Sequence, residues 1–154
     1  MLDHIIRTER EVLLVVYSNE HQPHRVGITD RIRTRFLQAI FRSDPKVKVP
    51  SSAKIVLPGK APELAVLRSD WDRVRATLAE NVERLTIHSS GKGVFRHPVG
   101  GWMDMQAVLD FLSVHLLHHG FQLARLRVAS KHLQRDFASV TAPRDGVLSV
   151  RENR

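Results

Sequence analysis

The chain has 154 residues, the length of one domain, and 42% of them are hydrophobic, enough for a core. It has no cysteine, which excludes disulfides, thiolate nucleophiles and sulfur-ligated metal sites, so nitrogen and oxygen must hold any metal. The net charge is +8, but the basic residues are scattered and only 6% of residues are aromatic, which argues against nucleic-acid binding.

Two features bear on location. No run of about 18 apolar residues is present, which argues against a membrane span and a membrane partner. The N-terminal sequence MLDHIIRTEREVLL is too charged for a secretory signal. Together they predict a cytoplasmic protein.

The first half of the chain predicts two helices. Residues 2–19 have helical periodicity, with an apolar face of Ile5, Ile6, Val12, Leu13, Val16 and Tyr17. Residues 28–44 predict a second, short amphipathic helix, whose apolar residues are Ile32, Phe36, Leu37 and Ile40. Residues 45–62 hold four of the seven prolines and predict an extended or looped segment that packs across the surface and could cover a site.

The second half predicts two longer helices. Residues 63–85 step by threes and fours through the apolar seam Leu64, Leu67, Trp71, Val74, Leu78, Asn81 or Val82, and Leu85. Residues 86–102 predict a glycine-rich connector, in which His97 forms a turn or lines a site and Trp102 anchors the next helix. Residues 103–137 predict the last helix, with Asp104 as its N-cap, and residues 138–154 predict a loose tail. No strand pattern is convincing, so the predicted fold class is all-α.

Polar residues interrupt one face of the last helix. Helical spacing from Val108 leads through Leu112, His115, His119 and Gln122 to Leu126, so the face is aliphatic at both ends and polar in the middle. Burying a polar group without a partner costs on the order of several kcal/mol. His115 and His119, four residues apart, can converge on one metal ion. The alternative is a hydrogen-bonded pair in the core.

The neighbours of this histidine pair have different expected roles. His118 points about 100° away from the face and is a weaker candidate ligand. Gln122 continues the face by one turn, and its amide suits a hydrogen bond to a metal ligand or to substrate.

A third ligand must come from another helix, and His4 lies within the first predicted helix. The remaining histidines lie at helix ends, in connectors or about three turns past His119: His21, His24, His88, His97 and His132. Glu9 follows His4 on the same helix and is expected to form a surface ion pair, with support of a metal ligand as the alternative.

The segment RHPVGGWMDMQAVLDFLSVHLLHHGFQL resembles the closing segment of the DinB-like (DinB/YfiT) metal-dependent bundle proteins. The matching residues are His97, Pro98, Gly100, His115, His118, His119 and Gln122. The N-terminal LDHIIRTERE is similar to the family's second helix, with His4 at the position of the first metal histidine. The resemblance covers nearly the whole chain and is strongest in the last third. It implies an up-down helical bundle, often a homodimer, that holds a divalent ion, zinc or nickel, on His4, His115 and His119.

The N-terminus departs from the family pattern. Family members have an entire helix before the one that bears the first histidine, whereas Met1 stands three residues before His4. Either the start is internal to a longer sequence, or an element such as one from a partner chain replaces the absent helix. The expected organisation is a bundle over residues 1–137 that lacks this helix, followed by the tail 138–154.

Three neutral imidazoles leave a divalent ion at least one free position, and the pKa of water bound there can fall to about 7 on zinc. The resemblance implies transferases and isomerases that use low-molecular-weight thiols such as mycothiol, bacillithiol or glutathione. Two hypotheses stay open. One is a metal-dependent thiol S-transferase or hydrolase acting on a small-molecule substrate, with Gln122 shaping the site. The other is a non-catalytic bundle that the ion ties together. No catalytic residue is assigned.

Overall fold

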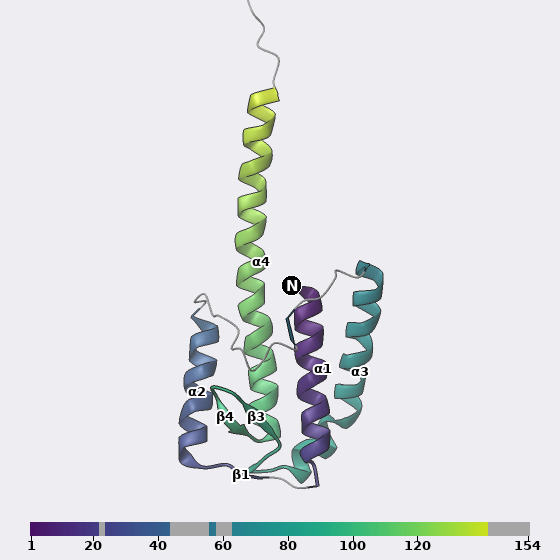
Figure 1. Cartoon of the computed structure of the whole chain (residues 1–154), viewed down its shortest axis with the longest axis vertical. Helices are drawn as coiled ribbons and strands as arrows, with labels where there is room; N and C mark the ends of the chain where they lie inside the picture. Colours follow the sequence, from purple (N-terminus) through teal and green to yellow (C-terminus); the bar gives the residue numbers. More distant parts are fainter. Residues whose placement is uncertain (22–23, 44–55, 58–62, 142–154) are drawn as a thin grey trace, which may run out of the picture. The chain divides into compact units, whose positions relative to one another are not determined.

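The computed structural model describes residues 1–21, 24–43, 56–57 and 63–141, and side chains up to residue 134 (Figure 1). These residues form four helices: α1 (Leu2–Asn19), α2 (Ile28–Arg42), α3 (Leu64–His88) and α4 (Met105–Thr141). Two short antiparallel pairs accompany them: β1 (His24–Arg25) with β2 (Lys92–Gly93), and β3 (Phe95–His97) with β4 (Gly101–Met103). The predominance of helix confirms the predicted all-α class in its coarse form.

The chain divides into two compact units, Met1–Gly120 and Phe121–Arg154. The first unit contains α1 to α3, the strands and the start of α4, and the second contains the rest of α4. None of the described helices has an apolar stretch long enough to cross a membrane.

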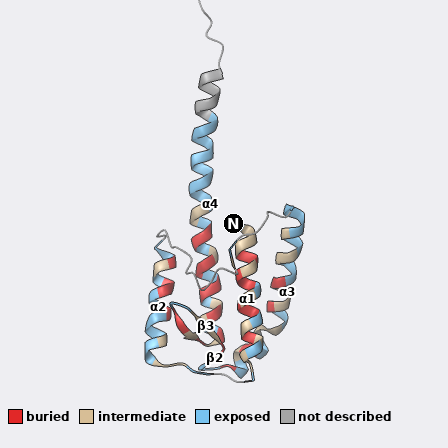
Figure 2. Ribbon diagram, viewed as in Figure 1, coloured by how far each residue is buried: buried red, intermediate tan, exposed pale blue. Residues whose placement is uncertain are grey.

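The core of the first unit lies where α1 packs against its neighbours (Figure 2). The predicted apolar face of α1 is confirmed, because Ile5, Ile6, Val12, Leu13 and Val16 are buried, and Tyr17 is half-buried against the core. α3 contacts α1 and buries Val74, Leu78 and Leu85 of its predicted seam. Leu64, at the start of that seam, is exposed.

The predicted face of α2 is partly wrong. Its buried residues are Thr34, Leu37, Gln38 and Phe41, whereas Ile32 and Phe36 are exposed. Hydrogen bonds explain the choice of face: the Thr34 hydroxyl donates to the Gly100 carbonyl over 2.9 Å. The Trp102 backbone N–H donates to Asp30 over 3.2 Å. These bonds hold the face of α2 that carries Thr34 and Asp30 against the β3–β4 pair.

The predicted connector 86–102 contains β2, β3 and the start of β4 instead of an irregular loop, which corrects the expectation of no strands. His97 forms the predicted turn between β3 and β4, because its Nδ1 accepts the backbone N–H groups of Val99 and Gly100 over 3.1 and 3.0 Å. Trp102 lies in β4 and stacks on His24 with ring centroids 3.8 Å apart.

The start of α4 is capped as predicted, because the Asp104 carboxylate accepts the Ala107 backbone N–H over 2.9 Å. The helix continues to Thr141, so residues 138–141 of the predicted loose tail are helical. Residues 142–154 lie outside the described residues. So does most of the predicted proline-rich segment 45–62, of which Val56 and Leu57 are described.

Candidate metal centre

Three histidines from two helices meet in the first unit. His4 lies in the first turn of α1, and His115 and His119 lie one turn apart on α4. Their ligand nitrogens all lie within 4.8 Å of one another. His115 and His119 are buried and His4 is half-buried. The structure therefore brings together the three residues that the sequence predicts as metal ligands, and we refer to them as the histidine group.

The ring positions suit a shared ion. The His4 ring centroid lies 5.3 Å from that of His115 and 5.0 Å from that of His119. The Nε2 atoms of His115 and His119 are 3.1 Å apart, which is also the distance of a hydrogen bond between the two rings, the alternative that the sequence left open. With metal–nitrogen bonds of about 2.0–2.1 Å, two ligand nitrogens lie about 3.3 Å apart at a tetrahedral angle and about 2.9 Å apart at a right angle. The observed separation falls between these values.

A backbone carbonyl sets the orientation of His4. The Nδ1 atom of His4 lies 2.6 Å from the carbonyl oxygen of Val56. Because a carbonyl only accepts, Nδ1 must carry the proton and donate, which leaves the lone pair on Nε2. Metal-binding histidines in proteins commonly donate their second ring nitrogen to such an acceptor. His4 is thus held in the tautomer that a ligand bonding through Nε2 requires.

The surroundings of His115 keep it neutral. Burial lowers its pKa to about 3, and the nearby His119, His4, His118 and His97 act in the same direction. The Phe111 and Phe41 rings both lie with centroids 5.7 Å from that of His115. A neutral imidazole keeps the lone pair that a metal ion needs, so His115 is in the protonation state that a metal ligand requires.

His118 is buried at 2% exposure but is not a member of the histidine group. Its ring lies against Phe41, with centroids 5.3 Å apart. This agrees with its predicted direction, one residue off the His115–His119 face. Gln122 is half-buried and belongs to the second unit, so its role beside the metal stays a prediction.

Glu9 corrects one expectation. Glu9 is 1% exposed and its carboxylate pairs with Arg75 of α3. The carboxylate is therefore buried, whereas a surface ion pair was expected. The Trp71 indole N–H also donates to Glu9 over 3.2 Å. The carboxylate therefore joins α1 to α3.

Two groups beside the site, the carbonyl of Val56 and the ring of Phe41, were not predicted from the sequence. A backbone carbonyl cannot be recognised from the residue type. The one hint in the sequence was that Val56 lies in residues 45–62, the segment predicted to cover a site. Phe41 lies at helical spacing from Leu37 and Thr34 and could have been found on that basis. It was not, because the face with Ile32 and Phe36 was predicted to be the buried one.

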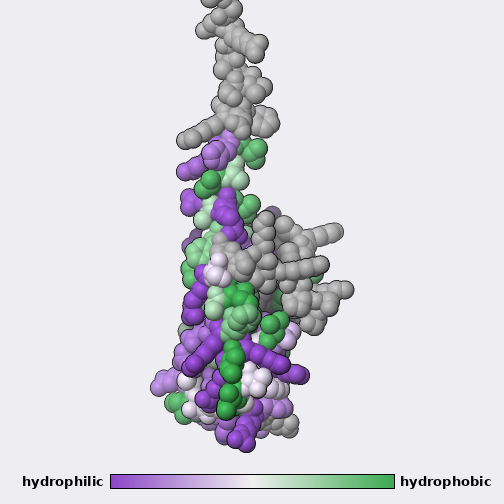
Figure 3. Space-filling model, turned by 90° about the vertical axis from the view of Figure 1, so that its left-hand side faces the viewer, coloured by the Kyte–Doolittle hydropathy of each residue, from purple (hydrophilic) through white to green (hydrophobic). Residues whose placement is uncertain are grey.

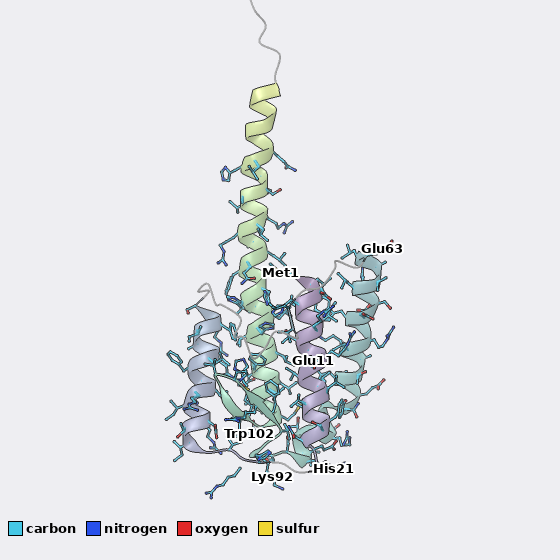
Figure 4. The ribbon with its side chains drawn as sticks, in the orientation of Figure 1. Met1, Glu11, His21, Glu63, Lys92 and Trp102 are labelled. Atoms are coloured by element: carbon cyan, nitrogen blue, oxygen red, sulfur yellow. The ribbon has the colours of Figure 1, made fainter. Side chains whose placement is uncertain are left out.

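A separate cavity of about 280 Å³ lies between α2, β4 and the start of α4. It is lined in part by Arg31, Arg35, Gln38 and Asp110, and none of the histidine group lines it. Trp102 lines the cavity, and Met1 marks the end of α1 that carries His4. The two residues lie toward opposite ends of α1 (Figure 4).

Comparisons with known proteins return no matching family model, no matching curated protein and no matching solved structure. The resemblance to DinB-like proteins therefore remains a prediction from the residues that carry it.

Proposed function

We propose that the protein binds a divalent transition-metal ion on His4, His115 and His119. The observation that carries this proposal is the meeting of three ligand nitrogens within 4.8 Å, from helix segments more than a hundred residues apart in sequence. The Val56 carbonyl adds support because it leaves the Nε2 lone pair of His4 available. Imidazole ligands suit zinc, nickel, copper and iron, and zinc or nickel is the ion that the DinB-like resemblance implies.

We propose further that the bound ion is catalytic. Among the described residues the group supplies three nitrogen ligands, which leaves a coordination position for water or substrate. A divalent ion at such a position lowers the pKa of bound water or keeps a bound thiolate ionised. This supports a metal-dependent thiol S-transferase or hydrolase of the DinB-like family, acting on a small molecule. A cytoplasmic homodimer belongs to the same proposal.

A second candidate is a structural ion. It is favoured by the position of His4 in the first turn of α1, because an ion shared with α4 would tie the end of one helix to another. In that case the protein would fill every coordination position.

Metal content tests the proposal itself. We expect purified wild-type protein to contain one ion per chain by elemental mass spectrometry, and His115→Ala and His119→Ala each to lose it, because two imidazoles hold an ion far more weakly than three. His118→Ala is the matched control, since it removes a neighbouring buried imidazole, and it should keep the metal. Equal metal content in all three variants would contradict the proposal.

Cobalt substitution separates the two roles of the ion. With an open position, adding a low-molecular-weight thiol to the Co(II) protein should produce a thiolate-to-cobalt charge-transfer band. A structural ion with all positions filled by protein should give a spectrum that the thiol leaves unchanged.

A further inference from the structure

The outward side of α2 carries a line of large apolar side chains. Ile28 is 79% exposed, and Ile32 and Phe36 are each 63% exposed. Residues four apart lie nearly above one another on a helix, so these three form one ridge, which we call the α2 stripe. Figure 3 views the side on which α2 lies in Figure 1 and shows a column of apolar surface with hydrophilic side chains on both sides.

The orientation of α2 is set by its opposite face. Leu37 and Phe41 are buried in the core, and Thr34 is bonded to the β3–β4 pair. Rotating α2 to bury the stripe would expose these residues and break that bond. A contiguous apolar surface that the fold leaves outside is typical of an interaction site.

The stripe is flanked by positive charge. At about 100° per residue, Arg31, Arg35 and Arg42 project on one side of it and Arg33 on the other. All four are exposed. Within the described part of the chain no carboxylate forms an ion pair with any of them. The acidic residue of α2, Asp30, is bonded to the Gly27 and Trp102 backbone.

We propose that the α2 stripe binds an acidic amphipathic helix of a partner protein. Side chains spaced four apart form a ridge that fits the groove between two ridges of a second helix. Asp and Glu residues beside that groove would meet the four arginines, whose planar guanidinium groups pair well with carboxylates. Burial of Ile28, Ile32 and Phe36 would supply the apolar centre of the contact.

Charge argues against two segments of this chain as the occupant, a second α2 and residues 121–154. A second α2 packed on the stripe would place arginines against arginines, and like-charge contacts oppose association. The second unit, residues 121–154, is also basic, with seven Lys and Arg against three Asp and Glu. A helix that lies in a membrane surface usually has a wide apolar face, whereas the angular position of Arg35 is only about 20° from that of Ile28, so a charged residue narrows the apolar face of α2.

Selection from a displayed library of random peptides tests the proposal although the partner is unidentified. The bait is the full wild-type chain, and the Ile32→Ser variant serves for counter-selection. We expect the enriched peptides to be acidic, with apolar residues three and four apart. Synthetic copies should bind Ile32→Ser and Arg35→Glu at least about tenfold more weakly than wild type. No enrichment, or enrichment of neutral or basic peptides, would overturn the proposal.

Matched variants keep the result specific. Leu14→Ser removes an exposed apolar residue of α1, and Arg68→Glu reverses an exposed charge of α3, so both should bind the peptides as wild type does. If the wild-type chain sedimented with phosphatidylserine–phosphatidylcholine vesicles and Ile32→Ser did not, the stripe would be a membrane-binding surface. If the wild-type chain formed a dimer in analytical ultracentrifugation and Ile32→Ser did not, the stripe would bind a second copy of the chain. Either outcome overturns the proposal. The metal content of all four variants should be unchanged, which keeps this test independent of the histidine group.

Discussion

Two histidines of the first unit are held in opposite tautomers by backbone groups. His4 donates its Nδ1 proton to the Val56 carbonyl, which leaves the Nε2 lone pair for a metal. His97 uses its Nδ1 lone pair to accept two backbone N–H groups, so its proton sits on Nε2. His97 belongs to the segment on which the predicted DinB-like resemblance rests, and its hydrogen bonds assign it to the turn.

The turn makes the protonation of His97 unfavourable. Burial lowers its pKa from 6.5 to about 4, and a proton on Nδ1 would also break both turn hydrogen bonds. Above pH 6.5 the imidazole is neutral in both the folded and the unfolded chain. Between pH 6.5 and about 4 the unfolded chain takes up a proton that the folded chain refuses, so the free energy of unfolding falls as the pH falls.

We therefore expect His97→Asn to flatten the dependence of stability on pH in this window. An asparagine side chain can accept the same turn N–H groups but does not titrate. The loss of stability between pH 6.5 and 4 should be smaller in the variant by about 3 kcal/mol, measured by urea unfolding at a series of pH values. Parallel pH curves for wild type and variant would contradict this account.

At the level of elements, the β3–β4 pair decides how α2 packs. Asp30 accepts N–H groups from Gly27 and Trp102, so one carboxylate caps α2 and joins it to β4. Gly101 has φ +74°, and a Cβ at this residue would collide with the Asp30 side chain and lie 3.3 Å from its Cα. The close approach of α2 to the strand pair therefore requires glycine at this residue.

Paired glycine variants separate the cost of backbone conformation from the cost of close approach. Gly91 also has positive φ, 66°, but no atom lies near its added Cβ. Gly91→Ala should lower the free energy of unfolding by about 1 kcal/mol, from the left-handed conformation alone. Gly101→Ala should cost at least about 1 kcal/mol more, because Asp30 must also move. Chemical denaturation of both variants measures the difference, and equal losses would mean that Asp30 adjusts freely.

Periodicity explains which elements the sequence predicted. α1, α3 and α4 each repeat apolar residues over several turns, and their existence was predicted correctly, as were most of the buried residues of α1 and α3. The predicted face of α4 is correct at Val108, Leu112, His115 and His119 and wrong at Leu126, which is 59% exposed. β3 and β4 have three residues each, too few to show an alternating pattern. The face of α2 was misassigned because its buried side includes Thr34 and Gln38, whereas its exposed side carries Ile32 and Phe36.

At the level of the whole molecule, the histidine group joins the start of α1 to the part of α4 that belongs to the first unit. A metal ion that binds only the folded chain stabilises it by about 2.7 kcal/mol at a free concentration one hundred times its Kd. For a chain of this length, that is equivalent to a rise in Tm of about 5–10 °C.

We expect a chelator to lower the Tm of the metal-loaded wild-type protein by this amount. His118→Ala should respond to the chelator in the same way, whereas His119→Ala should not respond, because it has no bound ion to lose. Differential scanning calorimetry with and without chelator measures the shifts. An identical response in all three proteins would mean that the chelator acts elsewhere than at the histidine group.

The sequence by itself determined that this chain is helical, which residues line α1 and the later turns of α3, and that His115 and His119 share one face of α4. These properties are local, because the period of the helix decides which side chains lie together. Only the tertiary structure decided that His4 reaches the same point and that the Val56 carbonyl orients it. The tertiary structure likewise decided that α2 turns Ile28, Ile32 and Phe36 outward. Each of these contacts joins residues distant in sequence, and their distances depend on how the elements pack rather than on any repeat within one element.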